Sequence, residues 1–140
     1  PLNRIVRVEG KEPGTPYYFS AVFPLRYPEA PVSVGRSWQY EDRVRTPDGT
    51  EATSAMKCSL AGRERSRNEE VYRIRCGGTG TGSNASIPDA RSSVNETSTI
   101  LVRAHDGALI ARESVVQMST EVPSKKMKIS GENRLTLQLE

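Results

Sequence analysis

Histidine and cysteine are scarce in this chain, and their scarcity limits the chemistry that the chain can perform. His105 is the only histidine, and it lies beside Asp106 and Gly107 in a predicted turn. A Ser-His-Asp triad needs a histidine held between a nucleophile and a carboxylate, and no Gly-x-Ser-x-Gly motif is present. A zinc site needs four ligands. Two cysteines and one histidine on separate hairpins do not supply that number. The sequence therefore predicts neither serine-hydrolase chemistry nor a metal site.

Other common signatures are also missing. The aspartates lack the close spacing of a calcium loop. The glycine-rich run at 77–83 lacks the Gly-x-x-x-x-Gly-Lys-Ser/Thr pattern of a phosphate-binding loop. No apolar run approaches the length of a membrane span. Acidic and basic residues are interleaved, and the net charge is only +3, which is typical of a solvated surface rather than a nucleic-acid footprint. We therefore expect no cofactor, and a protein, peptide or lipid partner rather than nucleic acid.

The two cysteines lie where a cross-strand disulfide is expected. Both the run before Cys58 and the run before Cys76 alternate apolar and polar residues, the period of a half-buried strand. Folding the chain about the polar stretch at 65–69 places Cys58 opposite Cys76 and Leu60 opposite Ile74. Directly opposite Cβ atoms in an antiparallel pair are about 4.5–5.5 Å apart, close enough for a bridge. Such a bridge implies a secreted, periplasmic or cell-surface protein; two reduced, buried thiols in the cytosol are the alternative.

The rest of the chain also has strand patterns. Strand signals at Leu2–Val8, Tyr17–Phe23 and Thr97–Arg103 are separated by proline- and glycine-containing turns such as Pro47-Asp48-Gly49. No segment has sustained helical periodicity. We expect an all-β antiparallel meander of about seven or eight strands, forming a curved sheet, a half-barrel or a sandwich. Residues 1–140 are expected to form a single β domain. Its flexible part is expected to be a Gly/Ser-rich loop at about 77–95.

Two further hairpins are predicted from turn residues. His105-Asp106-Gly107, with Gly107 in the left-handed conformation, is expected to pair Val102 with Ile110. Gly131-Glu132-Asn133 is expected to fold Met127 and Ile129 back onto Leu137 and Leu135.

Candidate functional residues fall into an apolar set and a basic set. The apolar set comprises residues that we expect to face a ligand or simply the core: Trp38, Tyr40, Met56, Leu60, Tyr72, Ile74, Val102 and Ile110. Trp38 is expected to anchor the core with its N–H bonded at the rim, whereas an exposed Trp38 beside Tyr40 would instead suit carbohydrate stacking. The basic set comprises candidate contacts for an anionic partner: Arg63, Arg65, Arg67, Lys125, Lys126 and Lys128. Neighbouring glutamates weaken the positive field of Arg63, Arg65 and Arg67. The three lysines resemble the charged residues that protect an exposed edge strand from pairing.

Residues 27–38 carry a family resemblance. Pro28, Pro31, Val32, Gly35 and Trp38 form a Pro-x-x-Pro-Val-x-x-Gly-x-x-Trp run. This run resembles an element that opens the strand meander of secreted, lipoprotein-type bacterial β-sheet proteins of unassigned function. The resemblance extends over most of residues 27–118, although its specific part is about a dozen residues. It implies an extracytoplasmic sheet domain of the cell envelope and carries no catalytic residues.

Taken together, these patterns predict a non-catalytic extracytoplasmic domain that binds or scaffolds a lipid, peptide or protein through a sheet face. One alternative is a hydrolase or lyase whose site is assembled only in the fold, recognisable by a cleft of groups with perturbed pKa values. Another is a subunit of a larger cell-surface assembly, recognisable by an unpaired edge strand or an exposed apolar patch.

Overall fold

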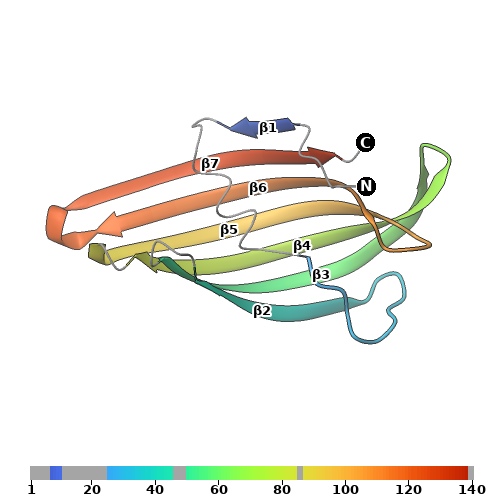
Figure 1. The fold of residues 1–140 in the computed structure, drawn as a ribbon, viewed down its shortest axis with the longest axis horizontal. Coiled ribbons are helices and arrows are strands. Elements are labelled where there is room, and N and C mark those ends of the chain that lie inside the picture. Colours follow the sequence, from blue (N-terminus) through green and yellow to red (C-terminus); the bar gives the residue numbers. More distant parts are fainter. Residues whose placement is uncertain (1–6, 11–24, 46–49, 85–86, 139–140) are drawn as a thin grey trace.

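The computed structural model describes residues 7–10, 25–45, 50–84 and 87–138, which form seven strands and one turn of 3₁₀ helix (Figure 1). In chain order these elements are β1 (Arg7–Gly10), β2 (Ser37–Arg45), β3 (Thr50–Ser66), β4 (Glu69–Asn84), β5 (Ile87–Arg103), β6 (Leu109–Val122), η1 (Pro123–Lys125) and β7 (Met127–Gln138). The predicted all-β fold is confirmed. No helix in this part of the chain is long and apolar enough to cross a membrane.

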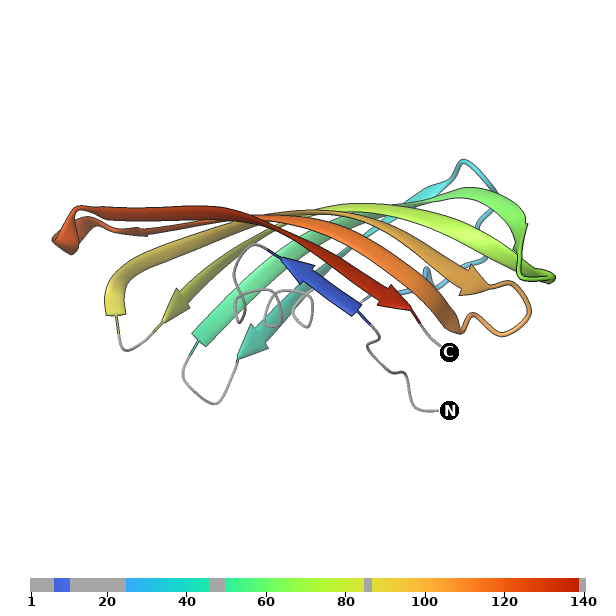
Figure 2. The same ribbon diagram turned by 90° about the horizontal axis from the view of Figure 1, so that it is seen from above.

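All seven strands pair antiparallel in one open sheet, in the order β1-β7-β6-β5-β4-β3-β2. β2 to β7 follow one another as the predicted meander, whereas β1 lies at the far edge beside β7. Figure 2 shows these strands as a single twisted layer. The sequence left a curved sheet, a half-barrel and a sandwich as alternatives. The described strands form one open sheet and not a sandwich.

The two faces of the sheet differ in composition because side chains alternate along each strand. In β5, every second residue from Val94 to Val102 is buried while those between are more exposed. We call the buried side the core face and the other side the open face. The core face carries the apolar cluster, whose buried members are Ala52, Met56, Cys58, Leu60, Ile74, Cys76, Val94, Ile100, Val102, Val116 and Leu135. Leu25 and Val32, which precede β2, also pack against this cluster.

The hairpin between β3 and β4 has the predicted register. Cys58 pairs with Cys76 and Leu60 with Ile74. The turn itself is tighter than the polar stretch suggested, since only Arg67 and Asn68 lie between the paired ends of the strands. Both residues have positive φ, 50° and 66°, as a two-residue turn with the right-handed twist of its strands requires.

The predicted loop at about 77–95 is wrong. Gly77–Ser83 continues β4, and β5 already begins at Ile87. Glycine is a poor strand former because it adds no side-chain packing. Here β3 pairs with one side of this stretch and β5 with the other, so the backbone hydrogen bonds of a central strand outweigh that preference.

Two predicted registers also need correction. Gly107 does adopt positive φ, 70°, but Val102 pairs with Leu109 because a bulge beside Leu101 shifts the register, so Ile110 is not its partner. The predicted hairpin about 131–133 is wrong, since Met127–Gln138 is one continuous strand along β6. Its alternating apolar residues suit a single strand as well as a hairpin, and the pairing with β6 decides between them.

Three predicted elements fall wholly or partly outside the described residues. They are the strand at Tyr17–Phe23, the turn at Pro47-Asp48-Gly49 and the first part of the strand at Leu2–Val8.

Candidate functional site

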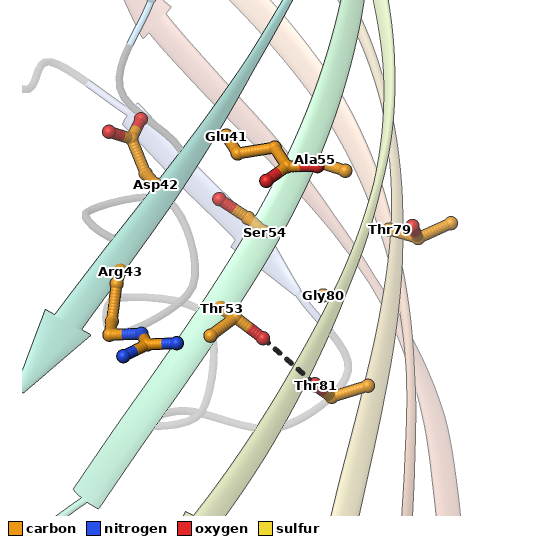
Figure 3. A pocket seen from close by; sticks show the side chains of 9 residues that line it. All are labelled: Glu41, Asp42, Arg43, Thr53, Ser54, Ala55, Thr79, Gly80 and Thr81. Carbon is orange, nitrogen blue, oxygen red and sulfur yellow. Dashed lines mark hydrogen bonds between the residues drawn. The ribbon is translucent and has the colours of Figure 1, made fainter.

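The open face is hollowed over β2, β3 and β4. One shallow groove of about 360 Å³ is lined by Glu41, Asp42, Arg43, Thr53, Ser54, Ala55, Thr79, Gly80 and Thr81 (Figure 3). A second hollow of about 520 Å³ adjoins it along the same strands and shares Glu41, Ala55 and Thr79. We refer to the two together as the β2–β4 groove. Its volume falls within the range of small-ligand sites, and it follows the strand direction.

Small side chains in the middle of the groove explain why the sheet is hollow there. Ala55 is paired with Glu41 on one side and Thr79 on the other, and Lys57 is paired with Gln39 and Gly77. A Cβ added at Gly77 would meet nothing within 4 Å. The longer side chains of β2 therefore stand above a floor of alanine and glycine.

The groove is accessible, and the exposed side chains around its first hollow are mainly polar. Glu41, Arg43, Thr53, Thr79 and Thr81 are all exposed. The hydroxyls of Thr53 and Thr81 lie 3.0 Å apart in a hydrogen bond across the β3–β4 pair. These side chains offer both hydrogen-bond donors and acceptors, together with one charge of each sign from β2.

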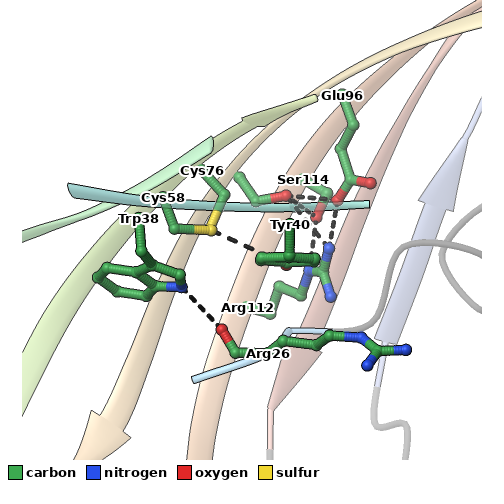
Figure 4. Close-up of a disulfide and its surroundings, with 9 residues drawn as sticks. Arg26, Trp38, Tyr40, Cys58, Cys76, Glu96, Arg112 and Ser114 are labelled. Atoms are coloured by element: carbon green, nitrogen blue, oxygen red, sulfur yellow. Dashed lines mark hydrogen bonds and ion pairs between the residues drawn. A yellow bond between two sulfur atoms is a disulfide. The ribbon is translucent and has the colours of Figure 1, made fainter. Parts of the chain in front are cut away.

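A disulfide joins the same strands on the core face. Cys58 and Cys76 are buried, and their Sγ atoms lie 2.02 Å apart (Figure 4). The Tyr40 hydroxyl lies 3.9 Å from Cys58 Sγ. Because β3 and β4 form the floor of the groove, this covalent link fixes the strands whose open sides a ligand would meet.

Trp38 and Tyr40 pack against the core cluster rather than forming an exposed stacking platform. The Trp38 indole N–H donates a hydrogen bond to the Arg26 carbonyl oxygen, 2.8 Å away, as expected for an anchoring tryptophan. Burial is the main reason that the pKa of the Tyr40 hydroxyl lies above its usual value. Both rings therefore connect β2 to the core.

A buried polar cluster crosses β5 and β6 on the core face. Arg112 donates to Glu96 in an ion pair whose side chains are 8% and 0% exposed. Ser98 and Ser114 are paired residues, and their hydroxyls lie 2.8 Å apart. The Arg112 Nε donates to Ser114 at 3.1 Å, and the Ser98 hydroxyl donates to Glu96. The cluster therefore places a charge pair on the same face as the apolar cluster.

The sequence analysis missed this cluster, although a signal for it was present. Val94, Glu96, Ser98 and Ile100 alternate with exposed positions, so a strand through them must place all four on one face. The prediction of a loop up to about Asn95 left Val94 out of this alternating pattern.

Some buried oxygen atoms lack a hydrogen-bond partner in the described part of the chain. They are Asp42 Oδ2, Ser54 Oγ and Glu96 Oε2. Asp42 and Ser54 are directly paired between β2 and β3, and the other carboxylate oxygen of Asp42 forms an ion pair with Arg26. A buried oxygen without a partner costs about 1–3 kcal/mol, so this part of the core face is polar at some cost to stability.

The predicted apolar set behaves mainly as core. Met56, Leu60, Ile74 and Val102 are buried, and Tyr72 is partly buried against them, with the Arg63 guanidinium 5.8 Å from the centre of its ring. Ile110 is only partly buried and lies outside the core cluster. Leu109 packs there in its place because of the bulge.

The two basic clusters lie at opposite ends of the sheet. Arg63, Arg65 and Arg67 are at the β3–β4 turn, whereas Lys125, Lys126 and Lys128 are at the β6–β7 connection (Figure 1). Arg63 forms an ion pair with Glu70, and Lys128 lies 3.6 Å from Glu121. The clusters therefore do not combine into one anionic site.

His105 lies in the β5–β6 turn. It is exposed, and its Nε2 lies 3.5 Å from an oxygen of Asp106. The backbone N–H of Ala108 and the Arg103 side chain donate to Asp106, and the pKa of that carboxyl is lowered, chiefly by the Ala108 N–H. Within the described residues, no three histidine, cysteine or acidic side chains are grouped to hold a metal ion.

Comparison of the chain with protein-family models, with curated proteins and with solved structures finds no match.

Proposed function

We propose that the chain is a non-catalytic extracytoplasmic binding domain that presents the β2–β4 groove to an extended peptide or protein segment. The observation that carries this proposal is the groove itself, an accessible hollow whose floor is Ala55 and Gly77 and whose walls are polar. Its direction along the strands suits an extended polypeptide better than a compact ligand.

The chemistry of the groove favours a peptide over a lipid. Threonine hydroxyls and the charged ends of Glu41 and Arg43 can bind backbone amides and charged side chains of an extended segment. An acyl chain needs contiguous apolar surface, and the apolar cluster of this sheet lies on the core face. The lipid-binding role expected for the apolar set is therefore not part of the proposal.

The extracytoplasmic location rests on Cys58 and Cys76. Stable disulfides are typical of secreted, periplasmic and cell-surface proteins and rare in the cytosol. The resemblance of residues 28–38 to an element of cell-envelope proteins supports the same location.

Selection from a displayed library of random peptides tests the groove. We expect selected peptides to bind the wild-type chain and to lose about tenfold or more of their affinity for Arg43→Glu, because a like charge replaces an attractive one. Arg134→Glu is the matched control, since Arg134 is exposed in β7, outside the groove. Peptides that bind both variants as tightly as wild type, or a library that yields no binder, would contradict the proposal.

A further inference from the structure

Within the described residues, only part of the outer edge of β7 is paired with another strand. β1 pairs with Asn133–Thr136, and no described residue pairs with the outer side of Met127–Glu132. Figure 1 shows β1 beside one half of β7 alone. A strand edge of this kind presents backbone N–H and C=O groups that can pair with another strand.

Apolar side chains lie along this uncovered edge. Met127 and Ile129 are 43% and 58% exposed, two of the few large apolar residues that the described part of the chain leaves in solvent. They alternate with Lys128 and Ser130, so the edge has an apolar side and a polar side. Natural edge strands are commonly protected by charge or proline, and here the charge is confined to one side.

We propose that Lys128–Glu132 pairs antiparallel with the same edge of a second copy of this chain, about a twofold axis at Ser130. In that register Lys128 lies opposite the partner's Glu132, and Glu132 lies opposite the partner's Lys128. An isologous interface must be self-complementary in this way, and opposite charges directly across a strand pair are stabilising.

The apolar side of the edge fits the same register. Ile129 lies opposite the partner's Gly131, where the absence of a side chain leaves space, since a Cβ at Gly131 would meet nothing within 4 Å. The two copies of Ile129 are then diagonal neighbours, about 7–8 Å apart between backbones and within reach of each other's side chains. Pairing therefore removes Ile129 from water on both copies.

Neighbouring residues extend the charge pairing. Lys128 lies 3.6 Å from Glu121, and the Gln117 amide donates to Glu132 at 3.3 Å, both from β6. Dimerisation would join these charged and polar side chains into one row that crosses from one sheet to the other. The result is one continuous antiparallel sheet, joined at the edge opposite to the strands of the β2–β4 groove.

Sedimentation velocity of the full chain over a range of concentrations tests the dimer. Lys128→Glu and Glu132→Lys each place like charges opposite one another twice, so we expect each to raise the dimer dissociation constant about tenfold or more. The double variant Lys128→Glu/Glu132→Lys restores both pairs and should dimerise like wild type. Arg75→Glu, on the open face of β4 and outside the groove, is the matched charge-reversal control and should have no effect on dimerisation.

Cross-linking tests the register. Under mild oxidation Ser130→Cys should form a disulfide-linked dimer, because the two copies of residue 130 face each other at the axis. Asn95→Cys, in β5 on the open face, should form none. A wild-type chain that stays monomeric at its highest soluble concentration, or charge reversals that leave dimerisation unchanged, would overturn the proposal.

Discussion

The two faces of this sheet use similar chemical groups in opposite ways. On the open face, Arg73 and Glu64 form an ion pair at 2.6 Å with both side chains at least a third exposed. On the core face, Arg112 and Glu96 form the same kind of pair almost completely buried. An exposed pair is worth little because water already solvates both charges, whereas a buried charge depends entirely on its partner.

The difference separates the groups that stabilise the fold from those that line the proposed binding groove. The core face holds the disulfide, the apolar cluster and the buried ion pair, so changes there should affect folding. The open face holds the groove, so changes there should affect binding with little effect on folding. Substitutions on the two faces should therefore differ in how strongly they change the free energy of unfolding.

Removing the buried cation should have the largest effect. Arg112→Ala removes the ion-pair partner of the buried Glu96 side chain, so we expect the free energy of unfolding to fall by about 3–5 kcal/mol. Urea denaturation followed by Trp38 fluorescence measures it. Arg75→Ala, on the open face of β4, is the control and should change stability by less than about 0.5 kcal/mol. Equal losses for the two variants would contradict the difference between the faces.

The buried pair can also be replaced as a unit. Glu96→Leu/Arg112→Met removes both charges together, and such replacements are often neutral or stabilising. We expect the double variant to recover most of the loss of Arg112→Ala. A double variant as unstable as Arg112→Ala would indicate that the loss of stability comes from the serine hydroxyls rather than from the charge pair.

Removing the disulfide should have the next largest effect. Cys58→Ala/Cys76→Ala opens a loop with a sequence separation of 18, so we expect a loss of roughly 3 kcal/mol, mainly because the unfolded chain gains entropy. Chemical denaturation of the double variant beside the oxidised wild type measures it. Unchanged stability would mean that the bridge does not constrain the unfolded chain.

The adjacent residues Gly77 and Gly78 allow the space on the two faces to be compared directly. A Cβ at Gly78 would lie 1.9 Å from the sulfur of Met56 on the core face, whereas a Cβ at Gly77 would enter open space. Gly78→Ala should therefore lose about 1–3 kcal/mol through overpacking, although movement of the flexible Met56 side chain can reduce that loss. Gly77→Ala should be neutral or gain up to about 1 kcal/mol. Thermal unfolding of the two variants gives the comparison, and the reverse order would contradict the assignment of faces.

The exposed ion pair should have the smallest effect. Arg73→Ala should lower stability by less than about 1 kcal/mol, and added salt should reduce the difference from wild type further. A loss as large as that of Arg112→Ala would show that solvent exposure does not determine how much these ion pairs contribute to the free energy of unfolding.

The sequence predicted the β3–β4 hairpin well because several signals agreed there. Alternating apolar residues, a polar turn and two cysteines all specify one register, and the structure has it. The stretch at 77–95 lacked such agreement, since glycine and serine favour loops when considered locally. Its strand conformation depends on pairing with β3 and β5, which local sequence does not reveal.

The candidate site was less predictable for a related reason. The β2–β4 groove exists because Ala55 and Gly77, in different strands, are brought near each other by the sheet register. The Glu96–Arg112 pair likewise requires two strands to meet. Period-2 alternation gives the face on which a side chain lies, but the neighbour across the strand comes only from the pairing.

Thiol alkylation under denaturing conditions, followed by intact-mass measurement, tests most directly the claim that Cys58 and Cys76 lock β3 and β4 together. We expect the unreduced monomer to resist alkylation and to gain two alkyl groups after reduction. Two alkylated thiols in a preparation never exposed to reductant would contradict both the covalent link and the extracytoplasmic location inferred from it.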